Sequence, residues 1–239
     1  MRLFTRRTGQ HPVDERIVLD DVHVRLGERD VLRGVTLDLP ERRIAVVGAN
    51  GSGKSTLARL LNGLVLPTGG SVRVHGHDTA DDGAAVRRAV GFVFTDPDAQ
   101  IIMPTVAEDV AYSLRRHGLS RAEVDDRVAA ALDQVGLAEH RDHPAHLLSG
   151  GQKQLLALTS VLVTGPAVLV ADEPTTLLDL RNTRDVGRRL WDLDQQVVVV
   201  THDLDVAAGA QRVLVVDEGR VVADDAPGPA LAAYRRRMA

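Results

Sequence analysis

The 239-residue sequence has no cysteine, so it can form neither a disulfide bond nor a thiolate metal site. Aromatic residues make up only 3% of the chain, whereas 44% of its residues are hydrophobic, which predicts a mainly aliphatic core. No apolar run approaches the ~18 uninterrupted residues of a membrane-spanning helix. The opening MRLFTRRTGQ is basic and lacks the apolar segment of a secretory signal. We therefore expect a cytoplasmic protein that reaches a membrane only through partner proteins.

Lysine is also scarce. Of the 29 basic residues only Lys54 and Lys153 are lysine, which leaves 27 arginines. In so biased a composition, a lysine indicates a need for a compact ammonium group rather than a planar guanidinium. Lys54 lies in a glycine-rich segment, and Lys153 is expected on a solvated helix face. The net charge of −4, with both signs interspersed, argues against a nucleic-acid partner.

Apolar periodicity predicts the order of the elements. Alternating residues over 17–40 predict antiparallel strands, and later apolar runs predict buried strands that alternate with helices. This order is typical of an α/β fold with a mainly parallel sheet covered on both faces. A helical insert is predicted over 105–136. Its two helices each begin with a capping box, Thr105 with Glu108 and Ser120 with Glu123.

The segment GANGSGKST fits the pattern G-x-x-x-x-G-K-[ST] and lies between a predicted strand and a predicted helix. Glycines let backbone N–H groups wrap a phosphate, Lys54 adds positive charge at its β- and γ-oxygens, and the Ser55 hydroxyl can ligate Mg²⁺. The residues predicted to bind the nucleotide are Gly48, Ala49, Asn50, Gly51, Ser52, Gly53, Lys54, Ser55 and Thr56.

Polar residues follow two buried strands farther along the chain. AVLVADEP places Asp172 and Glu173 at a strand's carboxyl end, the edge where open α/β sheets bind ligands. Asp172 is predicted to hold Mg²⁺ with Ser55, and Glu173 to polarise the water that attacks the γ-phosphate. VVVVTHD ends its strand at His202, which we expect at the same edge as a second catalytic residue.

Together these motifs resemble the ATP-binding-cassette (ABC) ATPases along nearly the whole chain. They occur in the family's order: Walker A at 48–56, the signature LSGGQ at 148–152, Walker B at 168–173, the D-loop ending at Asp179, and the switch His202. The resemblance implies a P-loop NTPase core with a mainly parallel sheet, an antiparallel β subdomain and a helical subdomain. It also implies hydrolysis of ATP to ADP and phosphate with Mg²⁺.

The resemblance further implies one ABC ATPase domain over residues 1–239. Its parts would be a nucleotide-binding core at 17–94 and 160–225, a helical subdomain with the signature at 105–150, and a C-terminal tail at 226–239.

The signature residues Ser149, Gly150, Gly151 and Gln152 allow two interpretations. Ser149 and Gln152 fit a capping box, which does not explain the adjacent glycines. Exposed backbone amides at a helix start can instead bind an anion. The family resemblance implies that this anion is the γ-phosphate of ATP held by a second ABC subunit. Two subunits, identical or different, would then pair head to tail and bury two nucleotides.

The sequence departs from the family pattern at two places. Thr95 stands where the family usually has a glutamine that contacts Mg²⁺ and couples to a membrane partner, and Gln100 lies five residues later. The aromatic residue that commonly stacks on adenine is also missing, since the matching stretch offers only His23 and Leu26. The histidines at 140, 143 and 146 lack a shared face, so we do not expect them to bind a metal.

Two stretches suggest a subtype. DPDAQIIMPTVAEDVAYSL resembles the ATPases of energy-coupling-factor (ECF) importers of vitamins or metal ions, and DEPTTLLDLRNTRDV resembles their biotin branch. This resemblance implies a transmembrane coupling protein and a membrane substrate-binding subunit as partners, with the ATPase on the cytoplasmic face of the membrane. Two alternatives remain: a soluble non-transport ABC ATPase that acts in complex assembly, and a nucleotide-gated binding module with little turnover.

Overall fold

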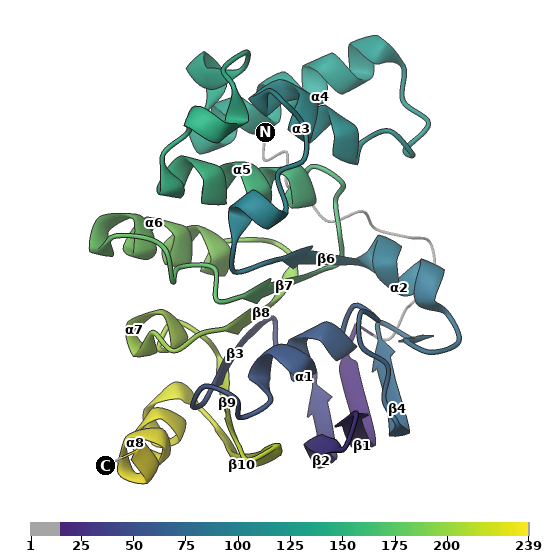
Figure 1. The fold of residues 1–239 in the computed structure, drawn as a ribbon, viewed down its shortest axis with the longest axis vertical. Coiled ribbons are helices and arrows are strands. Elements are labelled where there is room, and N and C mark those ends of the chain that lie inside the picture. The colour runs from purple at the N-terminus through teal and green to yellow at the C-terminus, as the bar shows by residue number, and fades with distance from the viewer. Residues whose placement is uncertain (1–14, 239) are drawn as a thin grey trace.

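Two β-sheets organise residues 15–238, the part of the chain that the computed structural model describes (Figure 1). The larger sheet has the order β10-β9-β3-β8-β7-β6, in which all pairs except β10–β9 are parallel. Its strands are β3 (Arg43–Val47), β6 (Val90–Val93), β7 (Val168–Asp172), β8 (Gln196–Val200), β9 (Arg212–Asp217) and β10 (Arg220–Asp225). The predicted mainly parallel α/β sheet is thus confirmed.

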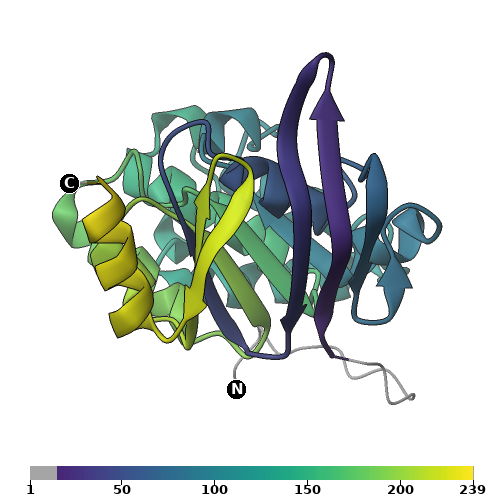
Figure 2. The same cartoon turned by 90° about the horizontal axis from the view of Figure 1, so that it is seen from below.

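The smaller sheet is antiparallel and has the order β2-β1-β4-β5. Its strands are β1 (Ile17–Leu26), β2 (Arg29–Leu39), β4 (Gly69–Val74) and β5 (His77–Asp78). The β1–β2 hairpin matches the antiparallel pair predicted over 17–40. Figure 2 shows this sheet beside the β9–β10 hairpin, on one side of the larger sheet.

Helices and the smaller sheet cover the two faces of the larger sheet. Successive residues of a strand point to opposite faces, so Val168 and Val170 of β7 pack toward α1 and the antiparallel sheet, whereas Leu169 and Ala171 pack toward the other helices. Every residue of β7 and β8 is buried, as expected for strands of a parallel sheet. The covering helices are α1 (Lys54–Leu60), α2 (Gly83–Ala89), α5 (Gly150–Leu162), α6 (Leu180–Trp191), α7 (Leu204–Ala207) and α8 (Pro227–Met238).

A helical layer lies beyond β6, at the top of Figure 1. It contains α3 (Val106–Ser113), α4 (Arg121–Val135) and the start of α5, joined through the short 3₁₀ turns η2 (Ala138–His140) and η3 (Ala145–Leu147). Both predicted capping boxes are present, at Thr105 and at Ser120. A third 3₁₀ turn, η1 (Pro97–Ala99), follows β6 and packs against α5.

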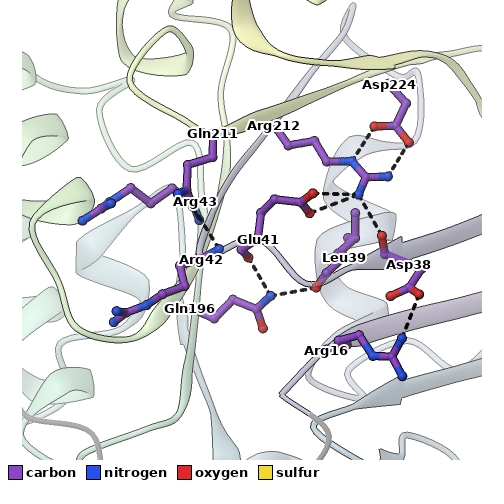
Figure 3. Close-up of polar contacts among 10 residues, drawn as sticks. All are labelled: Arg16, Asp38, Leu39, Glu41, Arg42, Arg43, Gln196, Gln211, Arg212 and Asp224. Atoms are coloured by element: carbon purple, nitrogen blue, oxygen red, sulfur yellow. Dashed lines mark hydrogen bonds and ion pairs between the residues drawn. The ribbon is translucent and has the colours of Figure 1, made fainter.

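A polar seam joins the two sheets at the amino end of the parallel strands (Figure 3). The Arg212 guanidinium donates to both carboxylate oxygens of Asp224, at 2.6 and 2.7 Å, and to Glu41 at 3.0 Å. These carboxylates raise the pKa of Arg212 above its usual value. The buried Gln196 amide donates to the carbonyl oxygens of Leu39 and Glu41. The polar side chains that connect β2 to the larger sheet are therefore hydrogen-bonded or ion-paired within the chain.

Some elements differ from those predicted. The helix α2 was not predicted from the sequence, and α7 is a single turn. The arginine-rich tail forms the helix α8 as far as Met238. The basic opening segment lies outside the described residues. Within residues 15–238 no helix is long and apolar enough to cross a membrane.

Candidate active site

The loop between β3 and α1 is enclosed by strands from elsewhere in the chain. Gly48 has φ 158°, and a Cβ there would lie 2.1 Å from the carbonyl oxygen of Val216 in β9. Gly53 has φ 109°, and its Cβ would lie 2.9 Å from the carbonyl oxygen of Val31 in β2. The turn after β9 also contacts the loop, because the Gly219 N–H donates to the Ser52 carbonyl at 2.9 Å. Only glycine fits these two positions of the loop.

Two polar groups inside this loop suit an anionic ligand. Lys54 is 5% exposed, and its Nζ donates to the carbonyl oxygens of Gly48 at 2.8 Å and Ala49 at 2.9 Å. Burial lowers the pKa of the Lys54 ammonium, and the nearby carboxylates of Glu173 and Asp172 oppose that shift. The Ser52 hydroxyl is buried and has no hydrogen-bond partner among residues 15–238. A phosphate in the loop would give both groups an anionic partner.

Ser55 and Asp172 meet where α1 begins and β7 ends. The Ser55 Oγ donates to the Asp172 Oδ1 at 3.0 Å, and Asp172 is 2% exposed. Burial raises the pKa of the Asp172 carboxyl, while the Ser55 hydrogen bond and the charge of Arg59 oppose the rise. The described residues hold no group of three or more metal-ligating acidic, histidine or cysteine side chains. Two hard oxygens nevertheless fit Mg²⁺, which is commonly held by one or two protein oxygens together with substrate phosphates and water.

Glu173 and His202 are in direct contact although 29 residues separate them. The His202 Nδ1 lies 2.7 Å from the Glu173 Oε2, and the His202 backbone N–H donates to the same oxygen at 3.3 Å. Thr176 Oγ1 also donates to it, at 3.1 Å. No described residue donates to the other oxygen, Oε1. Glu173 has φ 54°, a left-handed conformation that is costly for a residue with a side chain and is common at functional sites.

The signature forms the capped start of α5. The Ser149 Oγ accepts from the Gln152 N–H at 3.3 Å, and the Gln152 Oε1 accepts from the Ser149 N–H at 2.9 Å, which confirms the capping box. A Cβ at Gly151 would lie 2.9 Å from the Asn182 side chain, so the signature lies beside the start of α6. Asp179 caps that helix by accepting from the Asn182 N–H at 2.8 Å.

The predicted site residues thus fall into two groups. The loop residues, Asp172, Glu173 and His202 lie at the carboxyl edge of the parallel strands. The signature and Asp179 lie together at the starts of α5 and α6, and no hydrogen bond or ion pair among the described residues joins residues 149–152 to residues 48–56.

Thr95 and Gln100 both bind backbone close to β6. The Thr95 Oγ1 donates to the carbonyl oxygen of Asp172 at 2.9 Å. The Gln100 side chain accepts from the Phe94 N–H at 3.1 Å and donates to the Phe92 carbonyl at 3.3 Å. Gln100 therefore binds the backbone of β6 and of Phe94 after it, whereas the Thr95 hydroxyl binds the backbone of Asp172 itself.

His23 and Leu26, which stand where the family commonly has an aromatic residue that stacks on adenine, lie in the second half of β1. His23 contacts Asp21 at 3.1 Å, and Leu26 is 53% exposed at the end of β1. A nearer link to the loop comes from Arg29, whose Nη2 donates to the Gly51 carbonyl at 3.1 Å.

The expectation for Lys153 is wrong. Its side chain is only 16% exposed, and its Nζ lies 2.7 and 3.0 Å from the two carboxylate oxygens of Asp98 in η1. Sequence reasoning also missed His140, whose Nε2 lies 2.9 Å from the Gln152 Nε2. The rarity of lysine was the one signal that pointed to Lys153. For His140 there was none beyond its place in a histidine-rich loop.

Comparison with known proteins identifies the family. A model of the ABC transporter family matches residues 32–176. The biotin transport ATP-binding protein BioM of Rhizobium etli is 48% identical over 219 residues, which cover 92% of this chain and 97% of that protein. The energy-coupling factor transporter ATP-binding protein EcfA1 of Symbiobacterium thermophilum is 48% identical over 200 residues, which cover 81% of this chain and 70% of that protein.

The fold is likewise shared with a solved structure. CbiO1 from Clostridium perfringens, described as part of the ABC transporter complex CbiONQ, has 30% sequence identity and a TM-score of 0.82, and the match covers 93% of each chain. The sequence-based prediction of the family and its fold is therefore confirmed. This chain belongs to the ABC transporter family of ATP-binding proteins, which are ATPases coupled to transport.

Proposed function

We propose that this chain is the ATP-hydrolysing subunit of an ECF-type importer for a vitamin or a metal ion, with biotin as the first cargo to test. The observation that carries the catalytic part is the meeting of Lys54, Ser55, Asp172, Glu173 and His202 at one edge of the sheet. The resemblance of residues 96–114 to ECF ATPases, and the names of the BioM and EcfA1 relatives, support the transport part.

Each residue at this edge has a distinct role in the proposal. The loop amides and Lys54 bind the β- and γ-phosphates, and the Ser52 hydroxyl gains a partner there. Ser55 and Asp172 hold Mg²⁺, which neutralises charge on the β- and γ-phosphate oxygens when bound. Glu173 accepts a hydrogen bond from the attacking water through Oε1, because Oε2 already has three partners. Positioning and charge neutralisation provide most of the catalysis in phosphoryl transfer.

His202 orients Glu173 in this scheme. The His202 side chain is 57% exposed, whereas that of Glu173 is 14% exposed, so the imidazole can hold the carboxylate and still present Nε2 outward. We propose that this nitrogen donates to the γ-phosphate once the ligand is bound; because Nδ1 donates to Glu173, both ring nitrogens must then carry a proton. His202 then contacts both the carboxylate that orients the water and the phosphate that is transferred.

A second ABC subunit completes each site in the proposal. The first amides of α5, those of Gly150 and Gly151, have no acceptor within the helix and can bind the γ-phosphate held by the partner. Three large apolar side chains at or just before the starts of α5 and α6 are exposed: Leu147 is 72% exposed, Leu177 62% and Leu180 78%. Exposed leucines beside an unliganded helix start are typical of a surface that another protein covers. A head-to-tail dimer would bury both features.

The membrane partners would dock on the segment after β6. Ile102 is 60% exposed and Tyr112 is 41% exposed there, although their neighbours are packed on the core. We propose that a transmembrane coupling protein contacts this segment, that a membrane substrate-binding subunit joins it, and that the ATPase sits peripherally on the cytoplasmic face. Dimer closure on ATP would then move the coupling protein.

The substitution Glu173→Gln tests this proposal. Turnover should fall by about 10²–10⁴-fold, the usual contribution of a residue that accepts a proton, while ATP still binds. Sedimentation with Mg-ATP should show a dimer for the chain alone or for its transporter complex. Near-normal turnover would remove Glu173 from its role, and single protomers in both samples would refute the dimer. Mass spectrometry of membrane subunits that co-purify in detergent tests the importer part.

A further inference from the structure

The Gln152 side chain of the signature is held from two sides. Its Oε1 accepts from the Ser149 N–H at 2.9 Å, and its Nε2 lies 2.9 Å from the Nε2 of His140 in η2. The His140 ring lies edge-on to that of His143, with the ring centroids 5.0 Å apart. The loop that precedes the signature therefore contacts the signature through the His140 side chain.

The direction of these hydrogen bonds follows from the chemistry of the groups. Because the Gln152 Oε1 serves the Ser149 N–H, the Gln152 Nε2 must be the donor toward His140. The His140 Nε2 is then the acceptor, so a neutral ring carries its proton on Nδ1. That nitrogen is buried and has no partner among the described residues. A flipped Gln152 amide would place a donor against the Ser149 N–H, so the amide has one orientation, and in that orientation its Nε2 donates to His140.

We propose that His140 is a positioning residue for the signature: it holds the Gln152 amide so that the Ser149–Gln152 capping box stays closed. The closed box keeps Ser149 and the first turn of α5 in the conformation that leaves the Gly150 and Gly151 amides without an acceptor in the helix. This inference rests on the proposed function, because those amides matter for activity only if they bind the partner's nucleotide.

The test uses the Glu173→Gln chain as the parent. His140→Leu removes the acceptor, whereas His140→Gln supplies an oxygen near the place of Nε2. His146→Leu, in the same loop but exposed and without a side-chain hydrogen bond in the described structure, is the matched control. The readouts are dimer dissociation by sedimentation in Mg-ATP, nucleotide affinity of the protomer, and thermal midpoint without nucleotide.

Loss of one hydrogen bond worth about 1 kcal/mol corresponds to about a five-fold loss per signature. With two signatures per dimer, His140→Leu should raise the dimer dissociation constant by about 30-fold. His140→Gln and His146→Leu should stay within about two-fold of the parent, and nucleotide affinity of the protomer should not change in any variant. Equal dimerisation of His140→Leu and the parent would overturn the inference.

Failure of the proposed function can be told apart from failure of this inference. If the parent itself does not dimerise, hydrogen exchange of the nucleotide-free chain still tests His140. Exchange at the Ser149 amide should then be about five-fold faster in His140→Leu than in His140→Gln, since the Gln152 acceptor would no longer be fixed. Equal exchange in the two variants would overturn the positioning role.

Discussion

The two ends of the parallel strands differ in how their polar groups are satisfied. At the amino end, Arg212 has carboxylate partners on both sides, and Gln196 donates to two carbonyl groups. At the carboxyl end, the Lys54 ammonium donates to loop carbonyls, the Ser52 hydroxyl has no partner among residues 15–238, and Glu173 adopts a left-handed conformation. The Arg212 and Gln196 side chains of the seam are thus paired within the chain, whereas the Ser52 hydroxyl of the loop is left for a ligand in the proposed function. Stability and function are thus placed at opposite edges of one sheet.

Replacing Lys54, the buried cation at the carboxyl end of the strands, should give the largest effect on ATP binding. Lys54→Met should weaken ATP binding by about 100-fold or more, because a charge-assisted contact to phosphate is lost from a desolvated site. Its free energy of unfolding without nucleotide should not fall, since burial already disfavours the ammonium. Isothermal titration and urea denaturation measure the two quantities. A loss of stability in the free protein would show that Lys54 also has a structural role.

The matched substitution at the seam, Arg212→Met, should lower stability and leave ATP binding nearly unchanged. Arg212→Met leaves Glu41 and Asp224 facing each other without their shared partner, and should lower the free energy of unfolding by about 1–3 kcal/mol. ATP affinity should change by less than about two-fold. Urea denaturation checks the stability. Retained stability would mean that solvent already screens this ion pair.

Asp172→Asn should have opposite effects on stability and on ligand binding at the carboxyl end of the strands. Burial raises the pKa of Asp172, so the ionised carboxylate costs stability in the folded, ligand-free state. For a carboxyl whose pKa is raised on folding, stability is lost as pH rises from the ordinary aspartate value through the raised one. The Asn variant should therefore be more stable than the parent at pH 7, and the difference should vanish in acid. Its Mg²⁺-dependent ATP binding should be lost. Thermal midpoints across pH, with and without Mg-ATP, measure both.

The smallest effect is expected at the ion pair between η1 and α5. Lys153 and Asp98 meet at 2.7 Å, but the Asp98 side chain is 61% exposed. A double-mutant cycle with Asp98→Asn and Lys153→Met should give a coupling energy of about 0.5–1 kcal/mol that weakens in high salt. Urea denaturation of the four proteins measures it. A coupling near zero would show that the contact is only incidental.

The motifs could be predicted because short local rules govern them. The glycine loop, the capping boxes and the strand ends at Asp172 and His202 are each encoded within a few residues. The contacts that sequence reasoning missed join distant segments. Lys153 was expected in solvent because its partner Asp98 is 55 residues away, and the role of His140 depends on how η2 folds against α5. Thr95 and Gln100 could be recognised as departures, but their backbone partners depend on strand packing.

The walls of the phosphate loop have a consequence for biosynthesis. Val216 and Gly219 contact Gly48 and Ser52, yet they belong to the last β-hairpin of the described chain. A ribosome-bound fragment that ends before that hairpin holds the glycine segment without the wall that shapes it. We therefore expect the nascent polypeptide to acquire nucleotide affinity only after residues 212–225 have left the ribosome, which would spare the cell unproductive occupancy of unfinished subunits.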